Sequence, residues 1–183
     1  MKPPAVFLSF VKADQAWAEK LTTLLASTGA VVSNVPSDPK TPEPPLEQLR
    51  QAIVGASYNF VLIGPTTRFS KWVSREIELS TEAREDGPCA GLVGVILPTH
   101  ADFSRPYYDP ENVPVRLHDL IHSEYAILRK WSEDPAQIAR WLEETARRRE
   151  AYRPEPSLGA AAEIYRFAWD ESVDGARPNS EVL

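Results

Sequence analysis

The chain has 183 residues, of which 43% are hydrophobic and 25% charged, a composition typical of a globular protein with one substantial core. Its 20 basic and 26 acidic side chains give a net charge of −6, which argues against the broad basic surface of a nucleic-acid-binding protein. Cys89 is the only cysteine, which excludes an intramolecular disulfide and a cysteine-rich zinc site. The N-terminus lacks a signal-peptide pattern and no apolar run approaches the roughly 20 residues of a membrane span. We therefore expect a cytoplasmic protein with neither nucleic acid nor membrane as partner.

The first part of the chain predicts a strand, a helix and a second strand. Residues 5–10 are a short apolar run of strand-forming residues, and Asp14 can cap the helix that follows. Gly29 ends that helix, and residues 30–33 predict the next strand. The apolar face of the helix comprises Trp17, Leu21, Leu24 and Leu25.

Proline is unusually frequent in the chain, with 17 prolines against only 8 glycines, whereas glycine is on average the commoner of the two. Five of them fall in residues 34–45, where they exclude a helix interior or a central strand and predict a stiff loop. None of the prolines falls inside a predicted strand or helix interior, so their excess predicts stiff loops at the strand ends.

The middle of the chain continues the alternation of helices and strands. A helical pattern starts at Leu46 and is followed by apolar strands at 58–63 and 91–97, between which Ser70 caps a helix running to about Asp86. The helical pattern of the first of these helices runs through Leu49, Ile53 and Val54.

The last third predicts a strand at 125–128 and a helix that starts at Asp134 and Pro135. We expect this helix to point Arg147, Arg148 and Arg149 mostly outward, and the apolar tail at 160–169 to dock the C-terminus through its aromatic residues. Its inward residues are predicted to be Ile138, Trp141, Leu142 and Thr145. The alternation along the chain indicates an α/β protein with a doubly wound, flavodoxin-like sheet.

The site of such a sheet is expected beyond the carboxyl ends of its strands. No Gly-rich phosphate-binding motif follows the first strand, which disfavours the nucleotide-binding folds that use one. The loops after residues 10, 33, 63 and 97 are therefore where ligand-binding residues should lie.

Trp72 and Glu76 are four residues apart and share one face of the helix after the third strand. Glu76 therefore lies beside the apolar stripe of that helix, and it is the candidate for a functional carboxylate. Spacing alone favours a simpler interpretation, in which Glu76 reaches water at the helix margin, because charged side chains are rarely buried.

Two other motifs favour structural interpretations. His118 and His122 have a spacing that can bind a metal, but with no third ligand apparent we predict surface histidines and no metal site. Cys89 has no activating partner in the sequence and is interpreted as a buried or incidental thiol.

Four segments resemble a known family, the TIR-like signalling proteins of bacterial Thoeris anti-phage defence. The most diagnostic spans residues 60–78, FVLIGPTTRFSKWVSREIE. The others are VFLSF at 6–10, GVI at 94–96 and IYRFAWD at 164–170. The resemblance implies a TIR fold of about five parallel strands flanked by helices. It implies one domain over 1–183, with a core at about 4–130 and a C-terminal helical extension at about 131–183.

The resemblance also implies an enzyme that uses NAD as its substrate and needs no cofactor. Cleavage of the nicotinamide–ribose bond would give an ADP-ribose-derived, cyclic messenger for a separate downstream effector, made in response to a phage-derived trigger by a homo-oligomer. The catalytic glutamate of TIR enzymes corresponds to Glu76. By position, the residues expected to line the substrate site are Phe7, Ser9, Phe10, Asp38, Gly64 and Trp72.

Two alternatives remain open on the sequence. One is a non-enzymatic TIR-like adaptor, in which the face that carries Glu76 only packs and the surface recruits protein partners. The other is an enzyme similar to the nucleoside deoxyribosyltransferases, which also use a glutamate on a related α/β sheet.

Overall fold

The computed structural model describes residues 3–34, 46–82, 88–152 and 167–168. In chain order, the elements are β1 (Ala5–Ser9), α1 (Gln15–Ser27), β2 (Val31–Ser33), α2 (Leu46–Val54), β3 (Tyr58–Ile63), α3 (Lys71–Thr81), β4 (Gly91–Ile96), β5 (Tyr107–Tyr108), α4 (Val115–His122), β6 (Ile127–Lys130), α5 (Pro135–Ala151) and β7 (Phe167–Ala168). Short 3-10 turns occupy Lys12–Asp14, Thr67–Phe69 and Pro110–Asn112.

Five strands form one parallel sheet in the order β2-β1-β3-β4-β6. This is the strand order of flavodoxin-like folds, and it confirms the predicted fold class. Because β1 and β3 are neighbours, a helix that follows β3 can lie across both. All five carboxyl ends meet at one edge of the sheet.

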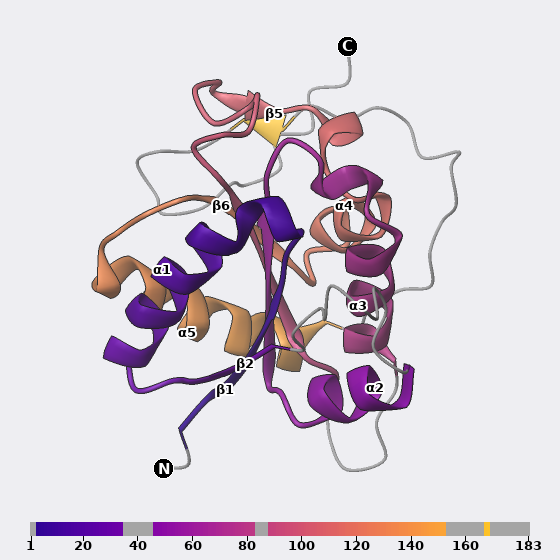
Figure 1. Ribbon diagram of the computed structural model, residues 1–183, viewed down its shortest axis with the longest axis vertical. Helices are drawn as coiled ribbons and strands as arrows, with labels where there is room; N and C mark the ends of the chain where they lie inside the picture. Colours follow the sequence, from indigo (N-terminus) through magenta and orange to yellow (C-terminus); the bar gives the residue numbers. More distant parts are fainter. Residues whose placement is uncertain (1–2, 35–45, 83–87, 153–166, 169–183) are drawn as a thin grey trace.

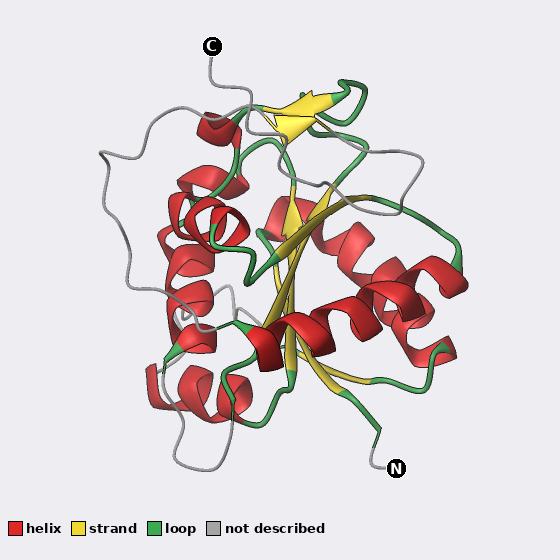
Figure 2. Cartoon of the chain, turned by 180° about the vertical axis from the view of Figure 1, so that it is seen from behind, coloured by secondary structure: helices red, strands yellow, loops and turns green. Residues whose placement is uncertain are grey.

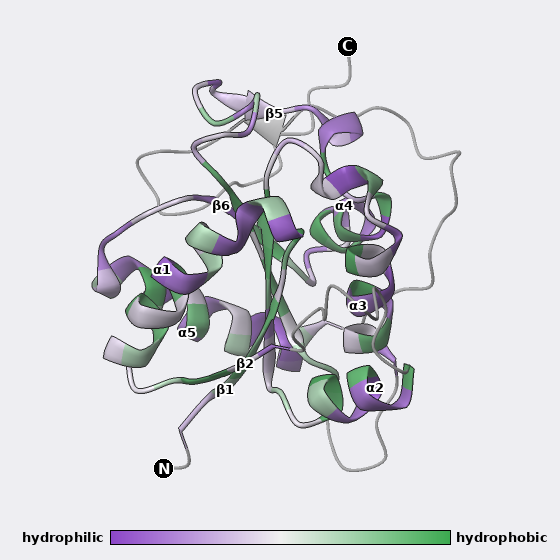
Figure 3. Ribbon diagram, in the orientation of Figure 1, coloured by the Kyte–Doolittle hydropathy of each residue, from purple (hydrophilic) through white to green (hydrophobic). Residues whose placement is uncertain are grey.

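Helices cover both faces of this sheet. Helices α1 and α5 lie on one face and α2, α3 and α4 on the other, so the strands run between two helical layers (Figures 1 and 2). Every residue of β4 is buried, and β3 is buried from Asn59 onward, as expected for strands covered on both sides. Colouring by hydropathy shows the apolar residues on the central strands (Figure 3).

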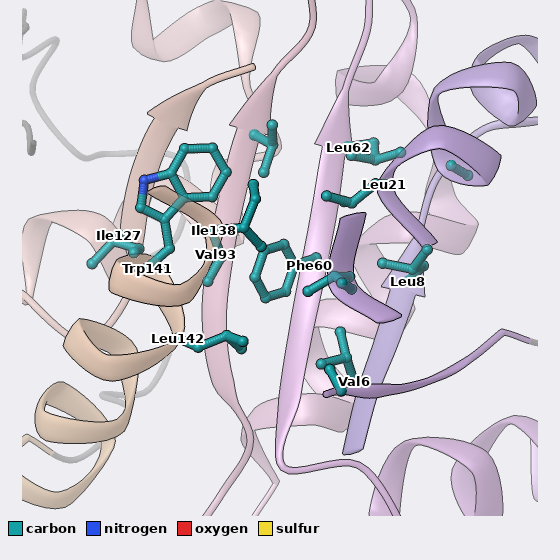
Figure 4. Close-up of a cluster of buried hydrophobic side chains, with 14 of the residues drawn as sticks. Val6, Leu8, Leu21, Phe60, Leu62, Val93, Ile127, Ile138, Trp141 and Leu142 are labelled. Carbon is teal, nitrogen blue, oxygen red and sulfur yellow. The ribbon is translucent and has the colours of Figure 1, made fainter. Parts of the chain in front are cut away.

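The core on the α1 and α5 side is the larger cluster of apolar side chains. Leu8 and Phe60 from the sheet meet Leu21 from α1 and Ile138 and Trp141 from α5 (Figure 4). The predicted inward face of α5 is confirmed, since Ile138, Trp141, Leu142 and Thr145 are all buried. Helix α5, in the predicted C-terminal extension, thus packs into the same core as the sheet.

The outward prediction for the three arginines of α5 is wrong for two of them. Arg148 is half-buried and pairs with Glu144, with an Nη2–Oε1 distance of 3.0 Å. Arg149 is also half-buried and donates to the main-chain oxygen of Ser57 at 2.8 Å. Arg148 Nη1 also donates to the Glu124 carbonyl at 3.0 Å, so the two arginines tie the last turns of α5 to the loops that enter β3 and β6.

Three local predictions need correction. Asp14 makes no side-chain capping bond, because a 3-10 turn precedes α1 and its carboxylate instead accepts from Thr67 Oγ1 at 3.4 Å. Helix α3 ends at Thr81, not near residue 86. Strand β6, predicted at 125–128, begins at Ile127. Tyr125 lies before it and donates its hydroxyl to the Ala90 carbonyl at 2.9 Å.

Two further expectations concern α2 and the tail. Val54, one of the apolar positions of the predicted helix pattern, is exposed, with an exposed fraction of 53% at the last residue of α2. Of the predicted aromatic tail, Tyr165 and Trp169 lie outside the described residues. The backbone of Phe167 pairs antiparallel with Tyr108, which joins β7 to β5.

The predicted cap of α3 is present and can be tested. Ser70 Oγ accepts from Val73 N at 3.2 Å, so Ser70→Ala should lower the free energy of unfolding by about 1 kcal/mol, and Ser70→Asp should retain the cap. Urea denaturation measures both. The control is Ser27→Ala, which removes an exposed hydroxyl at the end of α1 and should change stability by less than about 0.5 kcal/mol. Equal losses in the two alanine variants would contradict the capping role.

Candidate functional site

Glu76 lies on the buried face of α3, against β1 and β3. Its exposed fraction is 4%, so the interpretation that it reaches water at the helix margin is wrong. The reason is that α3 packs flat on the sheet, with Val73, Ile77 and Ser80 of the same face also buried. Next to it, Trp72 packs on an apolar cluster that includes Phe7 of β1.

The environment of the Glu76 carboxyl favours its neutral form. Burial raises the pKa of Glu76 to about 8, and hydrogen bonds from Ser9 and Trp72 lower it only in part. The Oε2 atom is buried and has no hydrogen-bond partner among the described residues. The carboxyl is therefore mainly protonated at neutral pH, and its Oε2 is buried without a partner among the described residues.

A chain of buried polar groups connects Glu76 to the two strands beneath it. Ser9 Oγ donates to Asn59 Oδ1 at 3.0 Å, and Asn59 Nδ2 donates to Ser80 Oγ at 2.8 Å. Ser80 Oγ in turn donates to the main-chain oxygen of Glu76 at 2.7 Å. Ser9, Asn59 and Ser80 are all fully buried, so each bond replaces one that water would otherwise make.

The structure brings together some of the predicted site residues and separates others. Phe7, Ser9 and Trp72 lie on the same side of the sheet as Glu76. Phe10 packs instead with the cluster on the α1 and α5 side, because successive strand residues point to opposite faces. Asp38 lies outside the described residues.

Gly64 also faces away from Glu76, toward Asp14. A Cβ atom at this position would stand 2.3 Å from Asp14 Oδ2, so only glycine fits against that carboxyl. The Gly64 amide donates to Thr67 Oγ1 at 3.0 Å. Burial raises the pKa of Asp14, while Thr67 and His100 lower it. Gly64 therefore packs against a second buried carboxyl, that of Asp14, which was predicted only as a helix cap.

Asn59 and Ser80 are the polar neighbours of Glu76 that were not predicted as site residues. A signal existed for each. Asn59 is an amide inside an otherwise apolar strand, and Ser80 is four residues after Glu76 on the same helical face. Their partnership could not be predicted, because it depends on the register between α3 and the sheet.

The histidine prediction is also wrong in part. His118 is buried, 5% exposed, and its Nδ1 lies 3.2 Å from the Tyr108 hydroxyl, because α4 turns this residue toward β5. Burial lowers the pKa of His118. Across the part of the chain that the structure describes, no group of three or more His, Cys, Asp or Glu side chains is arranged to hold a metal ion.

The loop after β4, at the carboxyl edge of the sheet, is organised by one buried carboxylate. Asp102 accepts from Arg105 Nη1 at 2.9 Å, from the Asp109 amide at 3.0 Å and from Asn112 Nδ2 at 3.2 Å. The Asp102 amide donates to His100 Nδ1, which leaves the proton of the neutral ring on Nε2, facing the Asn112 carbonyl. This loop is therefore held by specific hydrogen bonds.

Comparison with protein families agrees with this architecture. The sequence model of the TIR domain matches residues 6–142, and the chain belongs to the TIR domain family. Among solved structures, it is similar to the TIR domains of the activated Roq1 resistosome directly recognizing the pathogen effector XopQ, with a TM-score of 0.42 and 16% identity over 87% of this chain and 92% of that one. No curated protein matches the sequence.

Among the described helices, none combines the length and the apolar character needed to cross a bilayer.

The buried carboxyl predicts a dependence of stability on pH. Since the pKa of Glu76 rises from 4.5 to about 8 on folding, the folded state holds an extra proton between these pH values. The contribution of this proton to the stability of the folded protein is complete below about pH 4.5 and is lost as the pH rises toward 8. Glu76→Gln cannot ionise, so it should gain several kcal/mol over the wild type across this window, measured by urea denaturation at a series of pH values.

The matched control is Glu78→Gln, which changes an exposed residue of the same helix. Its difference from the wild type should stay constant over that pH window. A constant difference for Glu76→Gln as well would show that the carboxyl is not held neutral by burial.

Proposed function

We propose that this TIR-domain protein cleaves the nicotinamide–ribose bond of NAD, with Glu76 as the catalytic residue. The observation that supports the proposal most is the Glu76 carboxyl, which is 4% exposed and whose Oε2 has no partner among the described residues. An unpaired buried polar atom costs about 1–3 kcal/mol. Groups kept at such a cost, with a strongly shifted pKa, gather at functional sites.

The chemistry of NAD suits a single carboxyl group. The nicotinamide ring is a cation, so when its bond to ribose C1′ breaks, the electron pair moves to the ring nitrogen and nicotinamide leaves neutral. No acid is needed to protonate it. The ribose gains oxocarbenium character, which a nearby carboxylate stabilises electrostatically, and the same carboxylate can accept hydrogen bonds from ribose hydroxyls.

The neighbours of Glu76 have defined parts in this proposal. Ser9 and Trp72 favour the ionised carboxyl, since both lower its pKa, and Oε2 has no partner among the described residues. Oε2 is then the oxygen that meets the ribose. The positive charge of the nicotinamide ring favours the ionised carboxylate, so binding of NAD lowers the pKa of Glu76.

The product depends on the group that attacks C1′. Water gives ADP-ribose, and an atom of the same molecule gives a cyclic product. We propose the second route, with a cyclic messenger that activates a separate effector in anti-phage defence. Support comes from the likeness of residues 6–10, 60–78, 94–96 and 164–170 to the Thoeris TIR-like proteins. In this proposal a phage-derived trigger activates the protein, and self-association of TIR domains completes the site.

A non-enzymatic adaptor is the second candidate, and one observation favours it. The carboxyl of Glu76 is nearly closed to solvent, which suits a side chain that only packs. The two candidates differ in a simple outcome, since an adaptor releases no nicotinamide from NAD under any trigger.

Glu76→Gln should abolish NAD cleavage, with a fall of at least about 100-fold in kcat/KM, because an amide cannot stabilise the developing cation. Purified protein is incubated with NAD, with and without lysate from phage-infected cells, and products are identified by mass spectrometry. Glu78→Gln, on the exposed face of the same helix, should retain activity. Full turnover by Glu76→Gln would exclude Glu76 as the catalytic residue. Parallel incubations with deoxynucleosides test for a deoxyribosyltransferase.

The pH profile gives an independent check. Because the pKa of Glu76 in the free protein is about 8, kcat/KM should rise about tenfold per pH unit below 8 and level off above it. Steady-state assays between pH 6 and 9.5 measure this. A profile that is flat across this range would contradict catalysis by an ionised Glu76.

A further inference from the structure

The bonds around Asn59 have a fixed direction. Ser80 Oγ uses its only proton on the main-chain oxygen of Glu76, at 2.7 Å. It can therefore only accept from Asn59, whose Nδ2 lies 2.8 Å away. This sets the orientation of the amide, so Asn59 Oδ1 faces Ser9 and accepts its hydroxyl proton at 3.0 Å.

Ser9 consequently has one proton and two acceptors. Its hydroxyl donates to Asn59 Oδ1 at 3.0 Å, and the second group within its reach is the Glu76 carboxyl, whose pKa is lowered by interaction with Ser9. When Glu76 is ionised, Ser9 can stabilise it only by turning its hydroxyl away from Asn59. Asn59 Oδ1 would then lose its partner in a site where Ser9 and Asn59 are both fully buried.

We infer that Asn59 is a positioning residue: it competes with Glu76 for the hydroxyl proton of Ser9 and so adds to burial in disfavouring the ionised carboxyl until the cationic nicotinamide ring of a substrate arrives. The inference rests on the proposed function for its catalytic meaning. The competition itself is a property of the resting protein and can be measured without any activity.

Charged groups on the packed elements do not provide this control. Helix α2 carries Glu47 and Arg50, of which Arg50 pairs with Glu82. The ionisable residues of α4 are Arg116, His118, Asp119 and His122. Strands β1 and β3 turn only uncharged side chains toward α3. Burial, Ser9 and Trp72 are the causes that act on the pKa of Glu76.

The first experiment follows the carboxyl directly. Protein labelled with 13C at the glutamate side-chain carboxyl is titrated by NMR, and the Glu76 signal is assigned by its loss in Glu76→Gln. In Asn59→Leu, Ser9 is free to donate to Glu76, so the pKa of Glu76 should fall by about one unit. An unchanged titration midpoint would overturn the inference.

A double-mutant cycle separates this effect from simple loosening of the core. If Asn59 acts through Ser9, Asn59→Leu should leave the titration of Glu76 unchanged in a Ser9→Ala background. A shift of the same size in both backgrounds would mean that water enters the site, and the inference would be wrong.

Ser80→Ala is the second variant, since it is small and suits a helix interior. It removes the acceptor that orients Asn59, whose amide can then turn its NH2 group toward Ser9, and the pKa of Glu76 should fall here too. The control is Ser74→Ala, which removes the same kind of hydroxyl-to-carbonyl bond from α3, to Ser70, without touching Asn59. Equal titration midpoints of Glu76 in the two variants would contradict an effect of Ser80 that passes through Asn59 and Ser9.

The activity of the same variants tests whether the effect of Asn59 on Glu76 matters for catalysis. If Glu76 catalyses NAD cleavage, the rising limb of kcat/KM in Asn59→Leu should move to lower pH by the same amount as the NMR midpoint. A wild type without activity would count against the proposed function alone, because the NMR titration would still report on Asn59. An active variant whose NMR midpoint moves while its pH profile stays fixed would show that Asn59 does not position the catalytic proton.

Discussion

The arrangement of the site depends on one constraint, the burial of a carboxyl group between a helix and a parallel sheet. Glu76 is 4% exposed, and burial raises its pKa to about 8. The strand order causes this position, because β1 and β3 are neighbours and α3 lies across both. Ser9 from β1, Asn59 from β3 and Ser80 from α3 then converge beneath the carboxyl. A different strand order would leave Glu76 beside apolar groups alone.

The alternation of side chains along β1 divides the carboxyl edge of the sheet into two parts. Phe7 and Ser9 face α3, while Leu8 and Phe10 face α1 and α5. Each side holds a buried carboxyl, Glu76 on one and Asp14 on the other, but their surroundings differ. Asp14 accepts a hydrogen bond from Thr67 and fills the space left by Gly64, so it is a packing group. Glu76 keeps an oxygen that has no partner among the described residues, which makes that side the better candidate for a functional site.

Periodicity in the sequence was sufficient for the sheet and for most of its helices, because apolar runs and caps such as Ser70 act locally. It also placed Trp72 and Glu76 on one helical face. It could not predict the depth of Glu76, since burial depends on how flat α3 packs. The hydrogen bonds of Asn59 could not be predicted, because they depend on the register between strands β1 and β3 and helix α3. The inward orientation of His118, Arg148 and Arg149 depends on partners outside their own helices. Local sequence signals were therefore sufficient to predict the fold, whereas the polar contacts depend on long-range packing.

Burial of Glu76 suits both an enzyme and an adaptor, and the chemistry of the buried group is what supports the proposed enzyme. A packing role would be served as well by glutamine or methionine, neither of which adds a carboxyl that must stay protonated at neutral pH. The protein instead keeps an acid whose Oε2 has no partner in the part of the chain that the structure describes, with Ser9 and Trp72 as the groups that favour its ionised form. Such a group is stable while neutral and becomes a strong electrostatic partner when a cation enters the same dry space. The desolvation that keeps the resting carboxyl protonated is thus also what makes its ionised form effective against a cationic transition state.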